Sequence, residues 1–387
     1  MPEIILKGMT WGHSRGITPL LAFSQRFAEL HPKIKIVWEK RSLQQFADFP
    51  IEKLAEDYDL LIVDHPWVGC AAATECVLPL DDYLTEFYLA DQLKNSTGVS
   101  HISYHYKGHQ WALAIDAATP VASYRADKLH KHSTTVPKKW EEVLALAKDG
   151  KVAVPAIPID LLMNFYMFCI AQGREPFQNE EEVIDTATGI AALETMRQLY
   201  SLVDERMFSC NPIAVAELMS KTNDYWYCPF AYGYSNYARK GYADNLLAYT
   251  DLVKFNGKLL RSTLGGTGIS VSAFSQNKEA AIEFAKTVVS GKIQSTFYAE
   301  HGGQPGHRTA WTDANINLLT NNFFNNTLPA LDRAYMRPRY NGYLHFQDVA
   351  GDPLQQYLMK DGNPEKLLKE MNEMYRKSIV KQPVFAL

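Results

Sequence analysis

Short apolar stretches alternate with helix-like stretches over the first 66 residues. Leu20, Phe23 and Phe27 recur at intervals of three or four, which predicts one apolar face of a helix. The predicted order is strand, helix, strand, broken helix and strand, over residues 3–11, 20–32, 33–40, 43–58 and 59–66. This order is typical of a parallel sheet, whose ligands bind beyond the carboxyl ends of the strands. We therefore expect a site in the loops at 10–16 and 64–69.

The rest of the chain continues to mix the two patterns. The predicted elements are a long extended stretch at 109–129, a helix at 136–150, a buried strand at 151–158, helices within 180–207 and 213–222, and an irregular aromatic segment at 224–246. A glycine loop, a strand and a helix follow over 263–290, and helical spacing continues to Gly302 and Gly303.

The composition limits which classes of protein the chain can belong to. The 387 residues predict two compact units, and 39 Lys and Arg against 43 Asp and Glu give a net charge of −4. This balance predicts neither nucleic-acid binding nor attraction to an anionic membrane, and no run of about 18 apolar residues predicts membrane insertion. The five cysteines have no regular spacing and Met1–Lys7 does not resemble a secretory signal. We expect a cytoplasmic protein, or a periplasmic or extracellular one if a leader has been removed.

Four stretches together resemble one known family. They are "EDYDLLIVDHPWVGCAAATECVLPLDDYL", "YHYKGHQWALAIDAATPVASYRADKL", "VPKKWEEVLALA" and "GGTGISVSAFSQNKEAAIEFAKTVVSGKIQSTFYAEHGGQPGHR". Their order and spacing over residues 1–310 are similar to those of family 1 extracellular solute-binding proteins, the receptors of sugar-type ABC importers. The chain departs from that pattern at Arg125, where the family usually has Asn, and in carrying His13 and His65 in the predicted loops.

The resemblance implies an α/β, bilobal, periplasmic-binding-protein-like fold with a cleft between two α/β lobes. Lobe one would comprise 1–113 plus 254–305 and lobe two 118–250 plus 311–387, with hinges near 114–117, 249–253 and 305–310. It also implies hinge closure around a small polar ligand (sugar-like, aromatic or carboxylated) and an ABC transporter permease as partner.

Candidate ligand-binding residues follow from the predicted loops. In the first loop, Trp11 offers a flat face, and His13 and Arg15 offer donors to a carboxylate or phosphate. Asp116 interrupts an apolar strand, so it needs a hydrogen-bond partner or a groove. Core packing, capping and structural ion pairs are the alternatives for each. The other candidates are Asp64, His65, Trp67, Tyr232, Tyr234, Asn236, Gly266, Thr267, Gln304 and His307.

The histidines leave an enzyme on the same fold as the alternative function. His13, His65 and Asp116 are then the catalytic candidates, and these three with His307 are the candidate ligands of a divalent metal such as iron. His101 and His109 belong to a further histidine series, but Lys107 and Gly108 predict a hairpin turn that separates them. The sequence contains neither a G-x-S-x-G nor an H-E-x-x-H motif.

Overall fold

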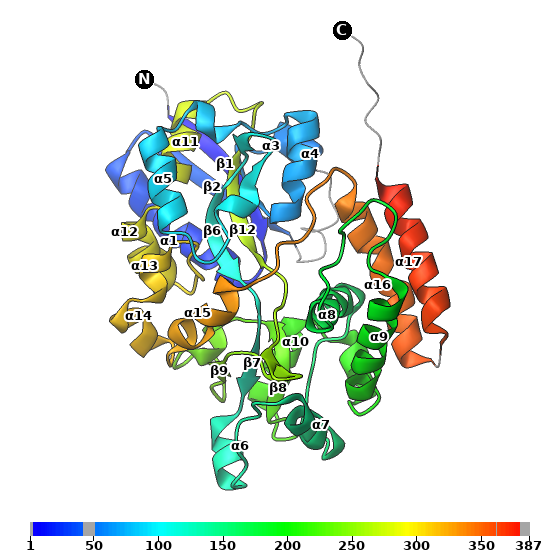
Figure 1. Ribbon diagram of the computed structural model, residues 1–387. Helices are drawn as coiled ribbons and strands as arrows, with labels where there is room; N and C mark the ends of the chain where they lie inside the picture. The colour runs from blue at the N-terminus through cyan, green and yellow to red at the C-terminus, as the bar shows by residue number, and fades with distance from the viewer. Residues whose placement is uncertain (1–2, 42–50, 361, 380–387) are drawn as a thin grey trace.

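The chain folds around two β-sheets, each with its own helices (Figure 1). The computed structural model describes residues 3–41, 51–360 and 362–379. The larger sheet has the strand order β2-β1-β3-β12-β6 and the smaller one β8-β7-β9. The predicted α/β bilobal fold is confirmed.

The larger sheet is mixed. Its strands are β1 (Ile4–Trp11), β2 (Ile34–Arg41), β3 (Leu60–Val63), β12 (Gly265–Val271) and β6 (Leu113–Ala118). β1 pairs in parallel with β2 and β3, as predicted, whereas β12 runs antiparallel to both β3 and β6. The helices of this half are α1 (Ser14–Leu30), α3 (Ile51–Asp57), α4 (Val68–Thr74), α5 (Glu86–Lys94), α11 (Lys278–Val288), α12 (Gly291–Ile293) and α13 (Arg308–Trp311).

The smaller sheet is antiparallel and carries the remaining helices. Its strands are β7 (Pro120–Tyr124), β8 (Tyr227–Tyr232) and β9 (Ala248–Thr250). The helices are α6 (Ala126–Lys131), α7 (Trp140–Lys148), α8 (Pro158–Ala171), α9 (Thr186–Tyr200), α10 (Pro212–Lys221), α14 (Ala314–Leu319), α15 (Phe323–Asp332), α16 (Tyr343–Met359) and α17 (Pro364–Ser378). Figure 1 shows α16 and α17 beside α8 and α9. Two hairpins, β4–β5 (His105–Tyr106 and His109–Gln110) and β10–β11 (Lys254–Phe255 and Lys258–Leu259), complete the strands.

The connections between the sheets run side by side. Only Thr119 separates β6 from β7, and its hydroxyl donates to the carbonyl of Thr263 at 3.0 Å. The Ala117 amide donates to the carbonyl of Gln304 at 2.9 Å. Ala117 and Gln304 lie at or beside the predicted hinges 114–117 and 305–310, whereas Thr263 lies well beyond the predicted hinge 249–253. The proposed hinges and lobe boundaries stay a prediction.

Several predicted elements are changed by the fold. The helix expected from residue 20 begins at Ser14, so Arg15 sits in its first turn and Pro19 lies inside it. The segment 151–158 is buried but forms only an isolated bridge at Val152, so the predicted strand is wrong. The irregular segment contains β8, an edge strand that tolerates Pro229 because Pro229 lies where the register of β8 against β7 shifts. Residues 43–50 of the predicted broken helix lie outside the described residues.

The helix α8 was not predicted. Its residues from Asp160 to Cys169 are all buried, so apolar side chains surround it and leave no amphipathic period. At 14 residues it is also shorter than a membrane span requires. None of the helices within 3–41, 51–360 and 362–379 combines the length and apolar character of a span.

Mutation of Gly69 to Ala tests how closely α4 packs on the connection between α15 and α16. A Cβ at Gly69 would lie 2.0 Å from the Arg339 carbonyl oxygen, and backbone atoms cannot rotate away. We expect a loss of about 1–3 kcal/mol in the free energy of unfolding, measured by urea titration. Ala73→Ser adds one atom at a half-buried position of the same helix and should change it little. Equal stability of both variants would contradict the packing described.

Candidate ligand-binding site

A cavity of about 590 Å³ lies where the two halves of the molecule meet. Its walls come from the ends of β1 and β3 and from β6 and β12 on one side, and from α8, α10, α16 and the end of β8 on the other. The predicted candidates that line it are Trp11, Arg15, Asp64, Trp67, Asp116, Tyr232, Tyr234, Gly266 and Thr267. Segments more than 200 residues apart in sequence therefore meet at one site.

Arg15 ties both halves together at this cavity. Its Nε donates to Asp116 Oδ2 at 2.9 Å, and its Nη2 forms a second, very short bond to Oδ1. Its Nη1 donates to the carbonyl of Gly233 at 3.0 Å, and its guanidinium lies 4.9 Å from the ring centre of Tyr234. The donors predicted for a ligand are thus largely taken up by the protein.

The pair is almost completely buried, with side-chain exposures of 4% for Arg15 and 1% for Asp116. Burial raises the pKa of Asp116, and the guanidinium opposes that rise. Two hydrogen bonds in parallel compensate the charges in a way that a single contact cannot. Asp116 therefore meets the requirement that a carboxylate inside an apolar strand must be paired.

A second arginine, Arg337, pairs with Asp64 at the same cavity. Its Nη2 donates to Asp64 Oδ1 and Oδ2 at 2.8 and 2.6 Å, and its Nη1 donates to Gln347 at 2.7 Å. Burial opposes ionisation of Asp64, but the nearby Arg337 lowers the pKa of its carboxyl well below the usual range. Arg337 was not among the residues predicted from the sequence. It follows α15 in a segment without helix or strand periodicity, 273 residues from Asp64.

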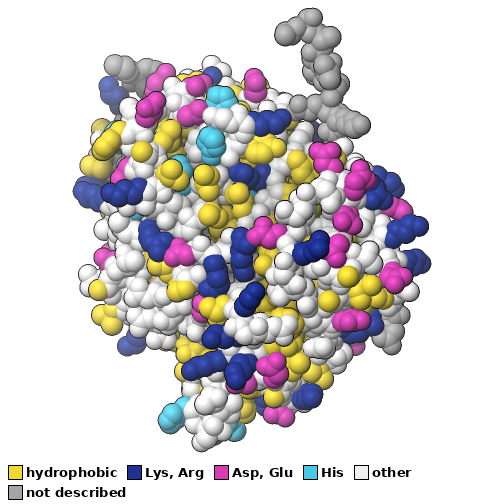
Figure 2. Space-filling model, in the orientation of Figure 1, with side chains coloured by type: hydrophobic (Ala, Val, Ile, Leu, Met, Phe, Trp, Pro, Cys, Tyr) yellow, Lys and Arg dark blue, Asp and Glu magenta, His cyan; other side chains and the backbone are white. Residues whose placement is uncertain are grey.

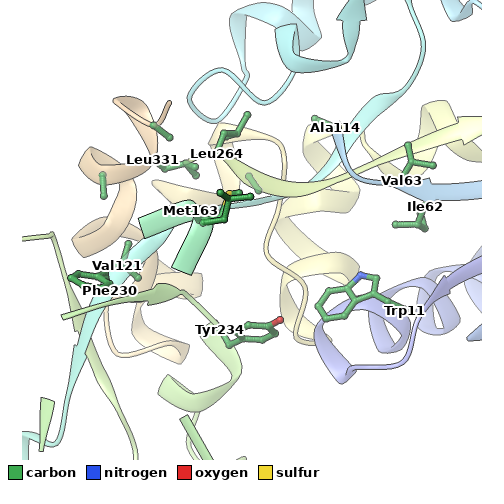
Figure 3. Packing of buried hydrophobic residues seen from close by; sticks show 14 of the residues in the cluster. Trp11, Ile62, Val63, Ala114, Val121, Met163, Phe230, Tyr234, Leu264 and Leu331 are labelled. Atoms are coloured by element: carbon green, nitrogen blue, oxygen red, sulfur yellow. The ribbon is translucent and has the colours of Figure 1, made fainter. Parts of the chain in front are cut away.

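Aromatic rings form the flat surfaces of the cavity. Trp11 and Tyr234 meet edge to face, with ring centres 6.1 Å apart, and Figure 3 shows the Tyr234 hydroxyl directed toward Trp11. The Tyr232 hydroxyl shares a 2.8 Å hydrogen bond with Thr263. These rings come from β1 and the end of β8, so both halves contribute apolar faces.

Gly266 lines the cavity, but its closest approach is to the protein itself. Its φ is +95°, and a Cβ would lie 2.3 Å from the Asp116 carbonyl oxygen. The register of β12 against β6 also shifts between Thr267 and Gly268. Glycine is required here by the left-handed backbone and the close strand pairing.

The predicted histidines do not line the cavity. His13 caps α1 by accepting from the Arg15 amide, and burial together with Arg15 lowers its pKa to about 4. His65 is enclosed beside Asp64, and burial and Arg337 lower its pKa to about 4. His307 caps α13 and its Nδ1 lies 2.7 Å from the Thr309 hydroxyl. These side chains support the walls and loops.

Asn236 and Gln304 also lie outside the lining. Gln304 accepts from the Ser235 amide at 2.9 Å and donates to the Ala117 carbonyl at 3.1 Å, which joins the connection between the sheets to the segment after β8. Asn236 is buried, and its Nδ2 lies 2.7 Å from the position of a Cβ on Gly302. Both residues act within the framework.

The predicted metal site is not formed. Among the described residues, the one group of three or more His, Cys, Asp and Glu side chains with ligand atoms close enough for an ion is Asp81, Asp82 and His109. That group lies beside the β4–β5 hairpin. The pairing of β4 with β5 confirms the turn predicted at Lys107 and Gly108. His13 and His307 cap helices, His65 is enclosed beside Asp64, and Asp116 pairs with Arg15, so these four side chains do not converge.

The lining also includes residues that the sequence analysis missed. They are Ala118, Ile157, Pro158, Ile159, Asp160, Met163, Asn211, Pro212, Gly265, Arg337, Leu344, Gln347, Asp348 and Asp352. A carboxylate in the apolar run "PIDLLMNFYMFCIA" was the available signal for Asp160, by the same argument that singled out Asp116. The residues of α16 offered no comparable signal.

A cleft whose walls come from two α/β lobes defines a protein that encloses a small ligand between lobes. Residues 16–295 match the family of bacterial extracellular solute-binding proteins. The chain belongs to this family, which confirms the resemblance found in the sequence.

Individual relatives are distant in sequence but similar in fold. The maltose-bound MalE3 of T. maritima is 18% identical, with a TM-score of 0.85 over 97% of this chain and 99% of that one. A solute-binding protein of Agrobacterium radiobacter K84 in complex with ribitol is 19% identical, with a TM-score of 0.83 over the same shares. A maltotriose-binding protein of Pyrococcus abyssi (strain GE5 / Orsay) is 25% identical over 122 residues, 32% of this chain and 25% of that protein.

The buried pair of Arg15 and Asp116 can be tested by a double-mutant cycle. Asp116→Asn leaves a buried guanidinium without its counterion and should lower the free energy of unfolding by about 3–5 kcal/mol. Arg15→Met leaves the buried carboxyl without its partner and should also destabilise the protein, whereas Arg15→Met with Asp116→Asn removes both charges and should lose much less than the sum of the two single losses. Urea titrations of the ligand-free protein at pH 7 measure all three; additive losses would contradict the coupling.

The pair of Asp64 and Arg337 predicts a pH dependence of stability. Because the folded protein holds the pKa of Asp64 below its ordinary 3.8, this stabilisation is complete above about pH 5 and is lost as the pH falls through the folded pKa. Arg337→Met should therefore be much less stable than the wild type at pH 6, and the difference should shrink toward pH 3. Arg308→Met breaks the exposed pair with Asp332 and serves as the control. A difference that stays constant with pH would contradict the assignment.

Proposed function

We propose that this protein captures a sugar or polyol in the cleft between its lobes and delivers it to an ABC transporter permease. The observation that carries the proposal is the cavity of about 590 Å³ with walls from both halves. A ligand there contacts both halves at once, so binding favours the closed arrangement.

The lining suits a polyhydroxylated ligand. Trp11, Trp67 and the two tyrosines offer faces against which the C–H side of a sugar ring packs. Asp64 and Asp116 are oriented by arginines, so their remaining acceptor capacity is directed by the protein before a ligand arrives. Fixed carboxylates bind hydroxyl groups without the entropic cost of ordering mobile side chains.

The relatives support the same class of ligand. The T. maritima protein is bound to maltose, the A. radiobacter protein is in complex with ribitol, and the P. abyssi relative is a maltotriose-binding protein. Partnership with a permease follows from the family. The predicted cytoplasmic location stays a prediction, and a permease partner favours the extracytoplasmic alternative.

Titration with maltose, maltotriose and ribitol tests the proposal. We expect at least one of them to raise the melting temperature and to change the tryptophan fluorescence, because Trp11 and Trp67 line the cavity. Tyr234→Ala should weaken binding by roughly tenfold or more, through loss of a cavity wall and of the ring beneath Arg15.

Tyr83→Ala removes a half-exposed ring outside the cavity and is the control for general effects of tyrosine removal. Small-angle scattering should show a smaller radius of gyration with the bound ligand. Binding that survives unchanged in Tyr234→Ala, or no binding of any sugar or polyol in a wider panel, would contradict the proposal.

A further inference from the structure

Asp160 brings an unpaired carboxyl to one end of the cavity. It stands in the first turn of α8, is 6% exposed, and lines the cavity together with Ile157, Pro158 and Ile159. Its Oδ2 is enclosed by protein and has no hydrogen-bond partner among the described residues. A buried carboxylate without a partner is strongly unfavourable, so this arrangement calls for an explanation.

The arginines of the cavity do not supply the missing counterion. Arg15 and Arg337 are the lining residues with a permanent positive charge, and each is bound by both oxygens of another carboxylate. The cavity contains five aspartates, so its lining carries more acidic than basic groups. Asp160 comes from α8, and Asp348 and Asp352 come from α16, which packs on α8.

In the part of the chain that the structure describes, the other elements around Asp160 add no positive charge either. The titratable groups that face it are Tyr200 of α9, Cys228 and Tyr232 of β8, and Tyr234 just beyond β8. Burial raises the pKa of Cys228 to about 12 and that of Tyr200 well above its usual value, so these groups stay neutral at pH 7. Electrostatic complementarity at this end therefore has to come from the ligand.

We infer that the α8–α16 end of the cavity is a subsite for a cationic group, so that the ligand class is an amino sugar or aminopolyol whose ammonium pairs with Asp160. The inference rests on the proposed function and narrows its ligand class. Asp352 adds negative charge at the same end, and the paired, aromatic end of the cavity receives the neutral hydroxylated part of the ligand.

Pairing with an ammonium changes the protonation of Asp160. Burial raises the pKa of Asp160 to about 8 in the ligand-free protein, so the carboxyl is mostly protonated at neutral pH. An ammonium stabilises the carboxylate, and the carboxyl loses its proton to solvent as the ion pair forms; no other bond changes. Affinity should then rise with pH up to about 8 and level off above it.

The test compares ligands that differ in one group, which is a hydroxyl in one and an ammonium in the other. Sorbitol and 1-amino-1-deoxysorbitol form one matched pair, and methyl α-glucoside and methyl 6-amino-6-deoxy-α-glucoside form a second. We expect the ammonium compound of at least one pair to bind at least tenfold more tightly at pH 8. The affinity of the protein for 1-amino-1-deoxysorbitol should increase roughly tenfold or more from pH 6.5 to 8.5, because the alkylammonium of this ligand stays charged over that range.

Calorimetry in buffers with different ionisation enthalpies gives a second, variant-free measurement. It should report close to one proton released per bound ammonium ligand at pH 7 and none for the neutral partner. Asp160→Asn keeps the shape of the side chain without its charge. This variant should abolish the proton release and the preference for ammonium ligands, while neutral ligands still bind. Asp149→Asn, at an exposed position at the end of α7 and outside the cavity, is the matched control and should keep both.

Each outcome separates the two proposals. Binding of neutral and ammonium ligands with equal affinity overturns the cationic subsite and leaves the proposed function standing. Affinity of neutral ligands that falls as the pH rises through 8 also overturns it, because Asp160 would then donate as a neutral acid. Failure of both members of every pair to bind, while another sugar or polyol of the wider panel binds, overturns the subsite alone; failure of the whole panel overturns the sugar proposal and the subsite with it.

Discussion

Arg15 is the point on which the ligand site depends, because its guanidinium joins three segments that the chain brings from different places. It bonds to Asp116 on β6 and to the Gly233 carbonyl beyond β8, and it lies over Tyr234. A buried guanidinium that loses its partners leaves an uncompensated charge. Relative motion of the two halves therefore has to keep these contacts, which places the pair near the fixed part of the cleft rather than at its moving edge.

The aspartate carboxyl groups differ in protonation state between the two ends of the cavity. Arg337 holds Asp64 in its charged form, whereas the described residues place no arginine or lysine beside Asp160. A carboxylate that already pairs with an arginine presents its oxygens as acceptors in fixed directions. A carboxyl that has no cation beside it can still bind a cation from the ligand. The polarity of the cleft is thus set by which aspartates receive an arginine.

The sequence predicted one wall of the site better than the other. Trp11, Arg15, Asp64 and Trp67 were found because loops after neighbouring parallel strands meet at one edge of a sheet. The opposite wall includes Asp160 and other residues of helices with no such rule, and Arg337 arrives from a connection near the end of the chain. The histidines looked chemically suggestive in sequence, yet they serve as caps and buried supports, as side chains next to a turn often do.

Elements with a clear period were predicted, and elements buried on all sides were not. The order of β1, α1, β2 and β3 and the hairpin turn at Lys107 and Gly108 follow from local pattern, whereas α8 shows no amphipathic face because both its sides are covered. By itself the sequence determined the two-lobed α/β class and one set of strand-end loops, since both depend on short-range periodicity and on family motifs. Only the tertiary structure decided which aspartate meets which arginine and that Asp160 meets none, because those pairings join residues up to 273 positions apart.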